Sequence, residues 1–459
     1  MSTAFSSLPL SGACLDNLSQ LGFSAMTPIQ SQSLPAILAG QDVVAKAKTG
    51  SGKTVAFGLG LLNKLDLSVQ GTQAMVLCPT RELADQVTKE IRRLARAIPN
   101  VKVLTLSGGV PMGPQMGSLD HGAHVIVGTP GRILKHMKSG RIRLKPLNTL
   151  VFDEADRMLD MGFEADIDAI LELLPQRRQT LLFSATYPEQ IDAMTRRVQS
   201  DPLMVTVEGS EAQEKIEQRL VEVAPAQKDQ ALLAVLAQYQ PESTVVFCNT
   251  RRACQQVAEV LEDAGVYVVA LHGDRDQRER DQTLVRFASK SVSVLVATDV
   301  AARGLDIKDL SLVVNYDIAF ESEVHVHRIG RTGRAGSKGR AISLAAGGEL
   351  HRVEEIEALQ GQPIPRLPFA KLSVPARIDL VPPMVTLSIG AGRKSKLRAG
   401  DILGALTAKK QIPGKAVGKI EIADRLSYVA IERQWAKEAL QVLQGDKIKG
   451  RNLIVRMHR

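Results

Sequence analysis

The sequence predicts an α/β protein with two similar parallel-sheet lobes and a small α+β domain whose elements run in the order βαββαβ. Short β-branched segments alternate with helix-like stretches over residues 1–360, which is typical of βαβ units. A polar segment without apolar periodicity, Val207–Lys215, divides these units into two series. Residues 362–383 contain six prolines, which disfavour both helix and central strand and mark the next boundary.

The expected elements follow from short apolar runs along the chain. The first lobe, residues 1–206, has candidate strands at Asp42–Lys46, Ala74–Cys78, Val125–Gly128, Thr149–Asp153 and Thr180–Ser184. The second lobe, residues 216–361, has them at Thr244–Asn249, Val266–Leu271, Val292–Thr298, Leu312–Asn315 and Gly339–Leu344. After the proline-rich linker 362–383, residues 384–459 are expected to form strands Met384–Gly390, Val417–Ile422, Ser427–Glu432 and Asn452–Met457, with helices Arg398–Lys409 and Gln434–Gln444. That order suits a four-stranded sheet backed by two helices.

The net charge of +9 is concentrated in the last domain. Residues 384–459 hold 16 Lys and Arg against 6 Asp and Glu, a local charge of +10, so the rest of the chain carries −1. A basic domain can simply have a solvated surface. The concentration of positive charge in one domain, next to lobes with almost no net charge, is also typical of a module that binds a polyanion. Charge alone leaves RNA, DNA and membrane open as partners.

Cysteine use and hydropathy limit the class of protein. The four cysteines form no CxxC pair and have no histidine spaced to complete a zinc site. The N-terminus lacks the basic start and apolar run of a signal peptide, and no apolar stretch approaches the roughly 20 residues that span a bilayer. We therefore expect a cytoplasmic protein with no membrane partner.

A phosphate-binding loop follows the first expected strand, with the sequence Ala-Lys-Thr-Gly-Ser-Gly-Lys-Thr at residues 47–54. Gly50 and Gly52 allow successive backbone N–H groups to surround a polyphosphate. Lys53 supplies a positive charge for the β- and γ-phosphates, and the Thr54 hydroxyl can bind Mg²⁺. A helix that begins here adds its positive dipole end.

An acidic loop completes this nucleotide site. The apolar segment Thr149–Asp153 continues into Asp153-Glu154-Ala155-Asp156. Asp153, at the strand end, can be the hard oxygen ligand that Mg²⁺ requires opposite the phosphate-binding loop. Glu154 is then placed to orient and deprotonate the attacking water. Acidic loops at strand ends are usually only solvated, but here the loop belongs to the same lobe as a phosphate-binding loop. The sequence therefore predicts ATP hydrolysis with Mg²⁺.

Together these motifs resemble those of DEAD-box RNA helicases of superfamily 2, and the matches extend over nearly all of residues 1–345. The resemblance implies two tandem RecA-like lobes, ATP and Mg²⁺ as cofactors, and RNA as a partner. In that family Ala47 is common, a glutamine equivalent to Gln30 reads adenine, and an aromatic at the place of Phe5 stacks on it. The expected ATP-binding residues are Phe5, Phe23, Thr27, Gln30, Thr49, Gly50, Ser51, Gly52, Lys53, Thr54 and Asp306.

The second lobe matches the last two family motifs, at residues 297–306 and 327–334. By this resemblance Arg331 and Arg334 are arginine fingers that reach the γ-phosphate from the second lobe. A planar guanidinium stabilises charge on the transferring phosphoryl, with an effect of roughly 10³–10⁵ in rate in other phosphoryl-transfer enzymes. The expected catalytic residues are thus Lys53, Asp153, Glu154, Arg331 and Arg334, and the expected coupling residues are Ser184, Thr186 and His327.

RNA contacts are implied for loops away from the ATP site. Glycine amides, threonine hydroxyls and arginines suit contact with phosphate and 2′-OH groups, which gives affinity without reading bases. Each loop taken singly is an ordinary turn, so only the whole set carries weight. The residues are Pro79, Thr80, Arg81, Gly108, Gly109, Thr129, Gly131 and Arg132 in the first lobe, and Gly273, Gln277, Arg280, Thr298 and Arg303 in the second.

The last domain resembles an RNA-recognition motif, and its position after the helicase lobes resembles the DbpA-type bacterial subfamily. That subfamily recognises a hairpin of 23S ribosomal RNA and acts in large-subunit maturation. RNA-recognition motifs place stacking aromatics on their two central strands, whereas here those strands offer only Tyr428. We therefore expect recognition of RNA shape and backbone by two basic loops, which contain Arg393, Lys394, Lys396 and Arg398, and Lys447, Lys449 and Arg451.

The leading hypothesis is an RNA-dependent ATPase that locally unwinds structured 23S rRNA in pre-50S particles, without an obligate protein partner. An ATP-gated RNA clamp, or a factor that remodels ribonucleoproteins without separating strands, is the alternative from another class, because a complete catalytic set permits turnover but does not prove unwinding. A DNA helicase is disfavoured by the full set of DEAD-box motifs.

Overall fold

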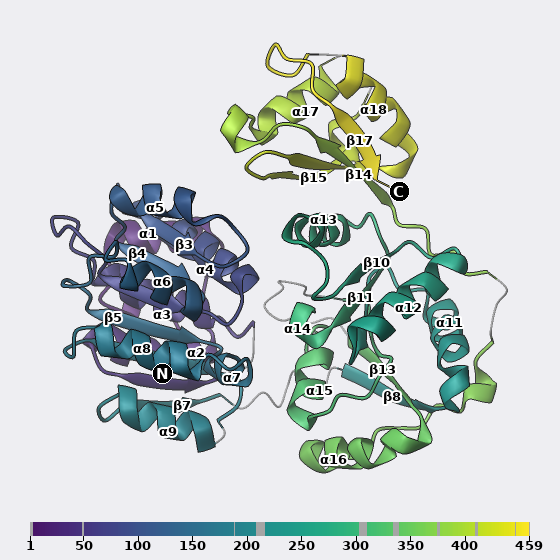
Figure 1. Cartoon of the computed structure of the whole chain (residues 1–459), viewed down its shortest axis with the longest axis horizontal. Coiled ribbons are helices and arrows are strands. Elements are labelled where there is room, and N and C mark those ends of the chain that lie inside the picture. The colour runs from purple at the N-terminus through teal and green to yellow at the C-terminus, as the bar shows by residue number, and fades with distance from the viewer. Residues whose placement is uncertain are drawn as a thin grey trace. The chain divides into compact units, whose positions relative to one another are not determined.

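The computed structural model describes residues 3–47, 50–187, 189–207, 216–302, 310–333, 339–373, 377–408, 412–445 and 447–458. The described residues up to 207 belong to one compact unit, and those from 216 onward belong to a second. The first unit contains one sheet and the second contains two (Figure 1).

The first lobe is built on a seven-stranded parallel sheet in the order β3-β4-β2-β5-β6-β1-β7. Its strands are β1 (Val43–Lys46), β2 (Ala74–Leu77), β3 (Val103–Leu106), β4 (Val125–Gly128), β5 (Thr149–Asp153), β6 (Gln179–Ser184) and β7 (Leu203–Thr206). Its helices are α1 (Gly12–Gln20), α2 (Pro28–Ala39), α3 (Lys53–Asn63), α4 (Arg81–Leu94), α5 (Met112–Asp120), α6 (Pro130–Lys138), α7 (Ala155–Asp160), α8 (Glu164–Leu173) and α9 (Glu189–Val198).

Two hydrophobic clusters cover the two faces of this sheet. Val43 and Ala45 of β1 point into a cluster formed with α1 to α4, whereas Val44 points into a cluster formed with α5 to α9. This alternation follows from the two-residue period of a strand. Because both faces are covered, the strands are apolar throughout and their carboxyl ends carry the polar loops.

The second lobe is also built on a parallel sheet, which has six strands in the order β10-β11-β9-β12-β13-β8. Its strands are β8 (Ile216–Glu222), β9 (Thr244–Cys248), β10 (Val268–Leu271), β11 (Val294–Thr298), β12 (Leu312–Asn315) and β13 (Gly339–Ala345). Its helices are α11 (Lys228–Tyr239), α12 (Arg251–Asp263), α13 (Gln277–Ala288), α14 (Asp299–Ala302), α15 (Ser322–Ile329) and α16 (Leu350–Gln360).

The C-terminal domain has an antiparallel sheet in the order β15-β16-β14-β17. Its elements are β14 (Met384–Ile389), α17 (Ala399–Thr407), β15 (Val417–Ile422), β16 (Ser427–Glu432), α18 (Ala436–Gly445) and β17 (Val455–His458). Figure 1 shows α17 and α18 on one face of this sheet, where Ile402, Leu406, Ala439 and Leu443 join its core. The expected fold class, two parallel-sheet lobes and a small βαββαβ domain, is confirmed.

The proline-rich segment 362–383 is attached to the second lobe where the structure describes it. Leu367 N–H donates to the carbonyl of Leu220 in β8. Leu372, Ile378 and Leu380 are buried in the same cluster as α11 and α12. The segment forms neither an α-helix nor a central strand, as its prolines predict, but its apolar residues extend the core of the second lobe.

Candidate active site and RNA-binding loops

The phosphate-binding loop connects β1 to α3 and depends on Gly52. This residue caps α3 with φ +95°, a left-handed conformation that favours glycine. A Cβ at Gly52 would lie 2.5 Å from Nε2 of Gln30, so only glycine fits here. The loop therefore passes close to α2, and Lys53 becomes the first residue of α3, where the helix dipole adds positive potential.

Thr27 and Gln30 form hydrogen bonds with the phosphate-binding loop. The Thr27 hydroxyl donates to the Ser51 carbonyl at 2.7 Å, and Gln30 Nε2 donates to the Gly52 carbonyl at 3.1 Å. Gln30 Oε1 accepts the Thr27 N–H at 2.9 Å. The structure thus links Gln30 to the phosphate-binding loop itself, and its contact with adenine stays a prediction. Phe5 is buried in the lobe core, and Phe23 packs against the same core.

The acidic loop begins where β5 ends. Asp153 is the last residue of the buried strand, and Glu154 follows in the left-handed region with φ +56° before α7 begins. Burial raises the pKa of the Asp153 carboxyl to about 7; the positive charge of Lys53 opposes this shift and the negative charge of Glu154 adds to it. Because the Asp153 side chain is buried, its carboxylate is poorly solvated and suited to a cation.

Four buried polar atoms without a hydrogen-bond partner occur on these loops. They belong to Ser51 (Oγ), Lys53 (Nζ), Asp153 (Oδ1) and Ser184 (Oγ), on loops at the ends of the adjacent strands β1, β5 and β6. Buried polar groups are normally paired, so such atoms require an explanation. One ammonium, one carboxylate and two hydroxyls are the groups that a nucleotide phosphate with its cation would satisfy.

Asp156 connects the acidic loop to the segment after β6. Its Oδ2 accepts from the backbone N–H groups of Ala185 at 3.1 Å and Thr186 at 2.9 Å, and from the Thr186 hydroxyl at 2.9 Å. A carboxylate that holds three donors fixes both segments in one arrangement. Asp156 therefore links the acidic loop to the Ser184-Ala185-Thr186 segment directly.

The predicted RNA-binding loops of the first lobe lie together. Arg81 Nη1 donates to the Gly108 carbonyl at 3.2 Å, and Arg132 Nη1 donates to the Val110 carbonyl at 2.9 Å. Thr80 accepts the Leu83 N–H and so begins α4. These loops follow β2, β3 and β4, so they lie on the same carboxyl edge as the ATP loops, in the other half of the sheet. Their contact with RNA stays a prediction.

In the second lobe, Gly273 and Thr298 follow the adjacent strands β10 and β11. Gly273 is exposed and Thr298 is buried. Gln277 begins α13, and its amide donates to Asp281 at 2.6 Å. The predicted residues Thr49, Arg303, Asp306 and Arg334 lie outside the described residues.

The two basic loops of the C-terminal domain are joined to each other. Lys449 Nζ donates to the Lys396 carbonyl at 2.7 Å and forms an ion pair with Asp401 at 3.2 Å. Ile448 and Arg451 exchange backbone hydrogen bonds of 3.0 and 3.1 Å around a tight turn. Lys449 and Gly450 both have positive φ there, as a two-residue hairpin turn of type I′ requires.

The cationic side chains of the two basic loops are exposed to solvent. Arg393, Lys394, Lys396 and Arg451 are exposed, and so is Lys447. Arg393 has an exposed ion pair with Asp424 at 3.3 Å, which contributes little by itself. The two loops, separated by about 50 residues in sequence, therefore form one basic surface.

Comparison with known proteins decides the family. The sequence model of the "DEAD/DEAH box helicase" family matches residues 27–194, that of the "Helicase conserved C-terminal domain" matches residues 227–336, and that of the "DbpA RNA binding domain" matches residues 386–457. The chain is 54% identical over 457 residues to the ATP-dependent RNA helicase DbpA of Escherichia coli (strain K12), covering 99% of each chain. The chain belongs to the DbpA-type DEAD-box ATP-dependent RNA helicases.

Other relatives agree with this assignment. The Bacillus subtilis (strain 168) ATP-dependent RNA helicase DbpA is 35% identical over 472 residues, with 98% of each chain covered. Among solved structures, S. cerevisiae Dbp5 bound to RNA and ADP BeF3 superposes with a TM-score of 0.74 at 29% identity, covering 80% of this chain and 96% of that one. Mss116p bound to ssRNA and AMP-PNP gives a TM-score of 0.73 at 25% identity, with 80% of each chain covered.

Arg328 is a buried residue of this helicase to which the sequence motifs assign no role. Its guanidinium donates to both carboxylate oxygens of Asp299 at 2.7 and 2.6 Å, to Asn249 Oδ1 at 2.7 Å and to the Asp317 carbonyl at 2.7 Å. It also lies over the Phe247 ring. Arg328 therefore anchors α15, which carries His327 and leads to Arg331. Its place inside the motif 327–334, next to the assigned His327, was the available sequence indication.

Asp156 is the other residue that the assignments omitted. It lies in the acidic loop three residues after Asp153, close to one helical turn, a spacing that allows an inward contact. The structure shows that contact with the Thr186 segment.

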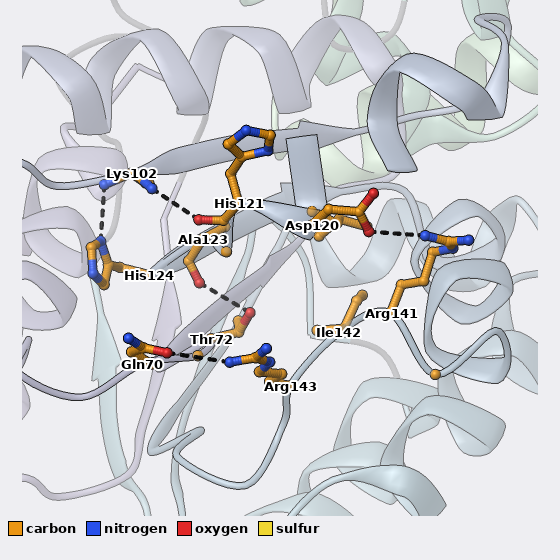
Figure 2. Close-up of a pocket in the computed structure, with 14 residues that line it drawn as sticks. Gln70, Thr72, Lys102, Asp120, His121, Ala123, His124, Arg141, Ile142 and Arg143 are labelled. Carbon is orange, nitrogen blue, oxygen red and sulfur yellow. Dashed lines mark hydrogen bonds and ion pairs between the residues drawn. The ribbon is translucent and has the colours of Figure 1, made fainter. Parts of the chain in front are cut away.

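A separate hollow of about 500 Å³ lies in the first lobe of the helicase, far from the ATP loops (Figure 2). It is lined by residues that precede β2, β3 and β4, among them Thr72, Lys102 and His124, so it opens at the amino ends of the strands. His124 Nδ1 accepts the Lys102 N–H, and Arg141 pairs with Asp120. Its lining consists mostly of exposed side chains paired with each other, and we assign it no part in ATP chemistry.

No helix of the described residues is long and apolar enough to cross a membrane. Within that part of the chain there is also no group of three or more His, Cys, Asp or Glu side chains that could hold a metal by themselves.

Proposed function

We propose that this helicase hydrolyses Mg²⁺-ATP to drive local unwinding of structured 23S rRNA during assembly of the large ribosomal subunit. The observation that carries the proposal is the single basic surface made by the two loops of a domain that belongs to the DbpA RNA-binding type. Two lobes with little net charge supply the motor, and the third domain, with +10, supplies the choice of RNA.

In the first lobe, each residue has a defined part. The backbone of Gly50 to Gly52 and the Lys53 ammonium bind the phosphates. Thr54 and Asp153 would hold Mg²⁺, whose charge neutralises the β- and γ-phosphate oxygens when it is bound. Asp153 fits this role because its carboxylate is buried and one oxygen has no hydrogen-bond partner. Glu154 takes the proton of the attacking water.

Asp156 and the second lobe complete the cycle. Asp156 passes the state of the acidic loop to Thr186 through the hydrogen bonds described above. Arg331, and Arg334 beyond the described residues, stabilise the charge on the transferring phosphoryl. Arg328 keeps the helix before Arg331 in place by its buried pair with Asp299. Hydrolysis in this scheme requires residues of both lobes, so it responds to RNA bound by both.

RNA is held in two ways. The loops around Arg81 and Arg132 bind the backbone without regard to sequence. The basic surface of the C-terminal domain selects a folded element, for which we propose a hairpin of 23S rRNA in pre-50S particles. The relatives that share all three regions are named ATP-dependent RNA helicase DbpA.

A matched pair of triple variants tests this selection in the full chain. Arg393→Glu with Lys394→Glu and Lys396→Glu should abolish the preference for 23S rRNA over unrelated RNA in the ATPase assay. It should also lower the salt dependence of RNA affinity, because fewer phosphates are neutralised. The control carries the same charge change at exposed positions of other elements in the domain, Lys415→Glu, Lys419→Glu and Lys437→Glu. If both triples lose preference equally, net charge and not this surface selects the RNA.

An ATP-gated RNA clamp remains the second candidate, because a complete catalytic site accounts for turnover without proving strand separation. A fluorescent duplex with a trap strand distinguishes the two. A helicase releases the short strand within an ATP cycle, whereas a clamp hydrolyses ATP and leaves the duplex intact.

A further inference from the structure

The central strands of the C-terminal sheet, β14 and β16, are buried on both faces. Residues at alternate positions of a strand face opposite sides, and one set points into the core beneath α17 and α18: Leu387, Ile389, Val429 and Ile431. The other set faces away from those helices. Of this set, Thr386 is 0% exposed, Ala430 is 1% exposed and Tyr428 is 4% exposed. An RNA-recognition motif normally leaves this second face open for bases.

The second lobe covers this face through α13 and the turn after it. The Ser291 and Thr386 hydroxyls form a hydrogen bond of 2.7 Å that is buried. Gln282 of α13 donates to His458 Nδ1 at 2.8 Å, and His458 Nε2 in turn contacts the Ser388 hydroxyl at 2.8 Å. All these residues belong to the same compact unit of the chain.

Tyr428 and Arg433 of the C-terminal domain also lie close to residues of the second lobe. Burial raises the pKa of the Tyr428 phenol, and its nearest charges include Arg278 and Asp281 of α13. Arg433 lies with its guanidinium over the ring of Tyr267, 4.6 Å from the centroid. Tyr428, the one aromatic side chain on the central strands, is therefore buried, with charged residues of α13 nearby.

The basic loops lie at one end of the sheet, whereas the contacts with the second lobe lie on its face. β14 and β17 are antiparallel, with Thr386 beside His458 and Ile389 beside Val455. The contacts with the second lobe extend along the central strands from Thr386 to Ser388 and its partner Tyr428. One basic loop follows the end of β14 and the other precedes β17, so both loops lie past the ends of the docked strands.

We propose that the sheet of the C-terminal domain is a docking surface for α13 of the second lobe and not a platform for RNA bases. The domain and the second lobe then move as one body through the ATP cycle. RNA bound by the basic loops is carried with the second lobe when ATP brings the lobes together. The statement about RNA rests on the proposed function, whereas the docking does not.

A disulfide trap tests the docking in the full chain. Ser291→Cys with Thr386→Cys places two thiols at positions whose hydroxyls lie 2.7 Å apart. The control pairs Ser291→Cys with Ser395→Cys, which lies in the basic loop at the other end of the domain. Mild oxidation should cross-link the first pair and not the second, read as a mobility shift on a non-reducing gel. Wild type, in which Cys78, Cys248 and Cys254 are buried, reports on background oxidation.

The activity of the trapped protein tests the one-body motion. The cross-linked variant should keep the RNA-stimulated ATPase rate and 23S preference of its reduced form. Equal cross-linking of both pairs, or of neither, overturns the docking. Stimulation that disappears on cross-linking and returns on reduction shows that the domain must undock, which overturns the one-body motion. If the reduced variant and wild type both show no preference for 23S rRNA, the RNA named in the proposed function is wrong. The cross-linking result then still tests the docking by itself.

Tyr428→Ala gives an independent measurement. Loss of a stacked base costs roughly 1–3 kcal/mol of RNA affinity. With the sheet docked on α13, this variant should bind RNA as tightly as wild type does. A loss of RNA affinity of roughly tenfold or more, which corresponds to about 1.4 kcal/mol, would instead identify Tyr428 as a base-stacking residue.

Discussion

At the residue scale, the site is defined by buried groups that lack solvent and protein partners. Lys53 Nζ and Asp153 Oδ1 are both buried without a hydrogen bond. Such groups destabilise the folded lobe when nothing binds them. They also strengthen the response to a bound nucleotide, because phosphate and its cation then satisfy groups that are already oriented. Function and stability are therefore opposed at Asp153, and both can be measured.

Asp153→Asn should raise the thermal stability of the nucleotide-free protein at pH 8 while it abolishes Mg²⁺-dependent hydrolysis. The folded-state pKa of about 7 lies above the ordinary value of 3.8 for an aspartate side chain. Because the folded-state pKa is raised, ionisation of the Asp153 carboxyl lowers the free energy of unfolding. This destabilisation grows as the pH rises from 3.8 to about 7 and is fully present above pH 7. The gain should be on the order of a few kcal/mol at most, since Lys53 loses an opposing charge.

The control for Asp153→Asn is the same comparison with wild type at a lower pH. At pH 5 Asp153 is protonated in the folded protein and resembles asparagine, so the gain in unfolding temperature should shrink. Calorimetry at the two pH values checks this. A gain that is the same at pH 5 and pH 8 would show that the charge of Asp153 is not its cause.

Glu154→Gln should bind ATP and RNA but hydrolyse ATP roughly 10²–10⁴ times more slowly, the usual contribution of a general base. The amide is nearly isosteric with the carboxylate but cannot accept the proton of water. Single-turnover measurements with saturating RNA separate binding from chemistry. Normal turnover in this variant would remove Glu154 from the proposed role.

At the scale of elements, the sequence predicted the buried strands and missed three at sheet edges. β3, β7 and β8 are all edge strands. The segments Leu203–Thr206 and Ile216–Glu222 include exposed and charged positions, because one side of an edge strand has no neighbour. A rule based on apolar runs cannot detect such strands. The predicted strands at Val417–Ile422 and Ser427–Glu432 match the structure to the residue.

The candidate site divides in the same way. Contiguous motifs predict residues such as Lys53 and Asp153, because each motif is local and its chemistry requires those side chains. Contacts between distant segments cannot be predicted in this way. The bond from Lys449 to Lys396 and the burial of Tyr428 depend on tertiary packing that no local pattern encodes.

Thr186→Val should uncouple ATP hydrolysis from strand separation. It removes the hydroxyl bond to Asp156 and leaves the two backbone bonds that hold the same carboxylate. Hydrolysis with saturating RNA should remain near normal, while strands separated per ATP should fall. The control is Thr72→Val, which removes a hydroxyl bond to Ala123 at the opposite edge of the sheet and costs about 1 kcal/mol of stability. Uncoupling in the control as well would remove Asp156 from the pathway.

At the scale of the whole molecule, the proposed catalytic residues belong to both compact units, with Lys53 and Glu154 in the first and Arg331 in the second. Arg331→Ala should abolish RNA-stimulated hydrolysis, by roughly 10³–10⁵ if Arg331 acts as an arginine finger. Nucleotide affinity should change by only several-fold, because ground-state binding belongs to the first lobe. Equilibrium binding of a fluorescent nucleotide, measured beside the steady-state rate, separates the two. A variant with weak nucleotide binding but normal turnover at saturation would place Arg331 outside the active site.

Truncation after Leu380 should give a folded two-lobe ATPase that no longer prefers 23S rRNA. Leu372, Ile378 and Leu380 pack in the core of the second lobe, so this cut leaves that core whole. The removed segment carries the +10 charge of residues 384–459, and the salt dependence of RNA affinity should flatten accordingly. Competition between 23S rRNA and unrelated RNA of equal length, at two salt concentrations, measures both effects. If the truncated protein still prefers 23S rRNA, selection belongs to the loops around Arg81 and Arg132, and the C-terminal domain only adds affinity.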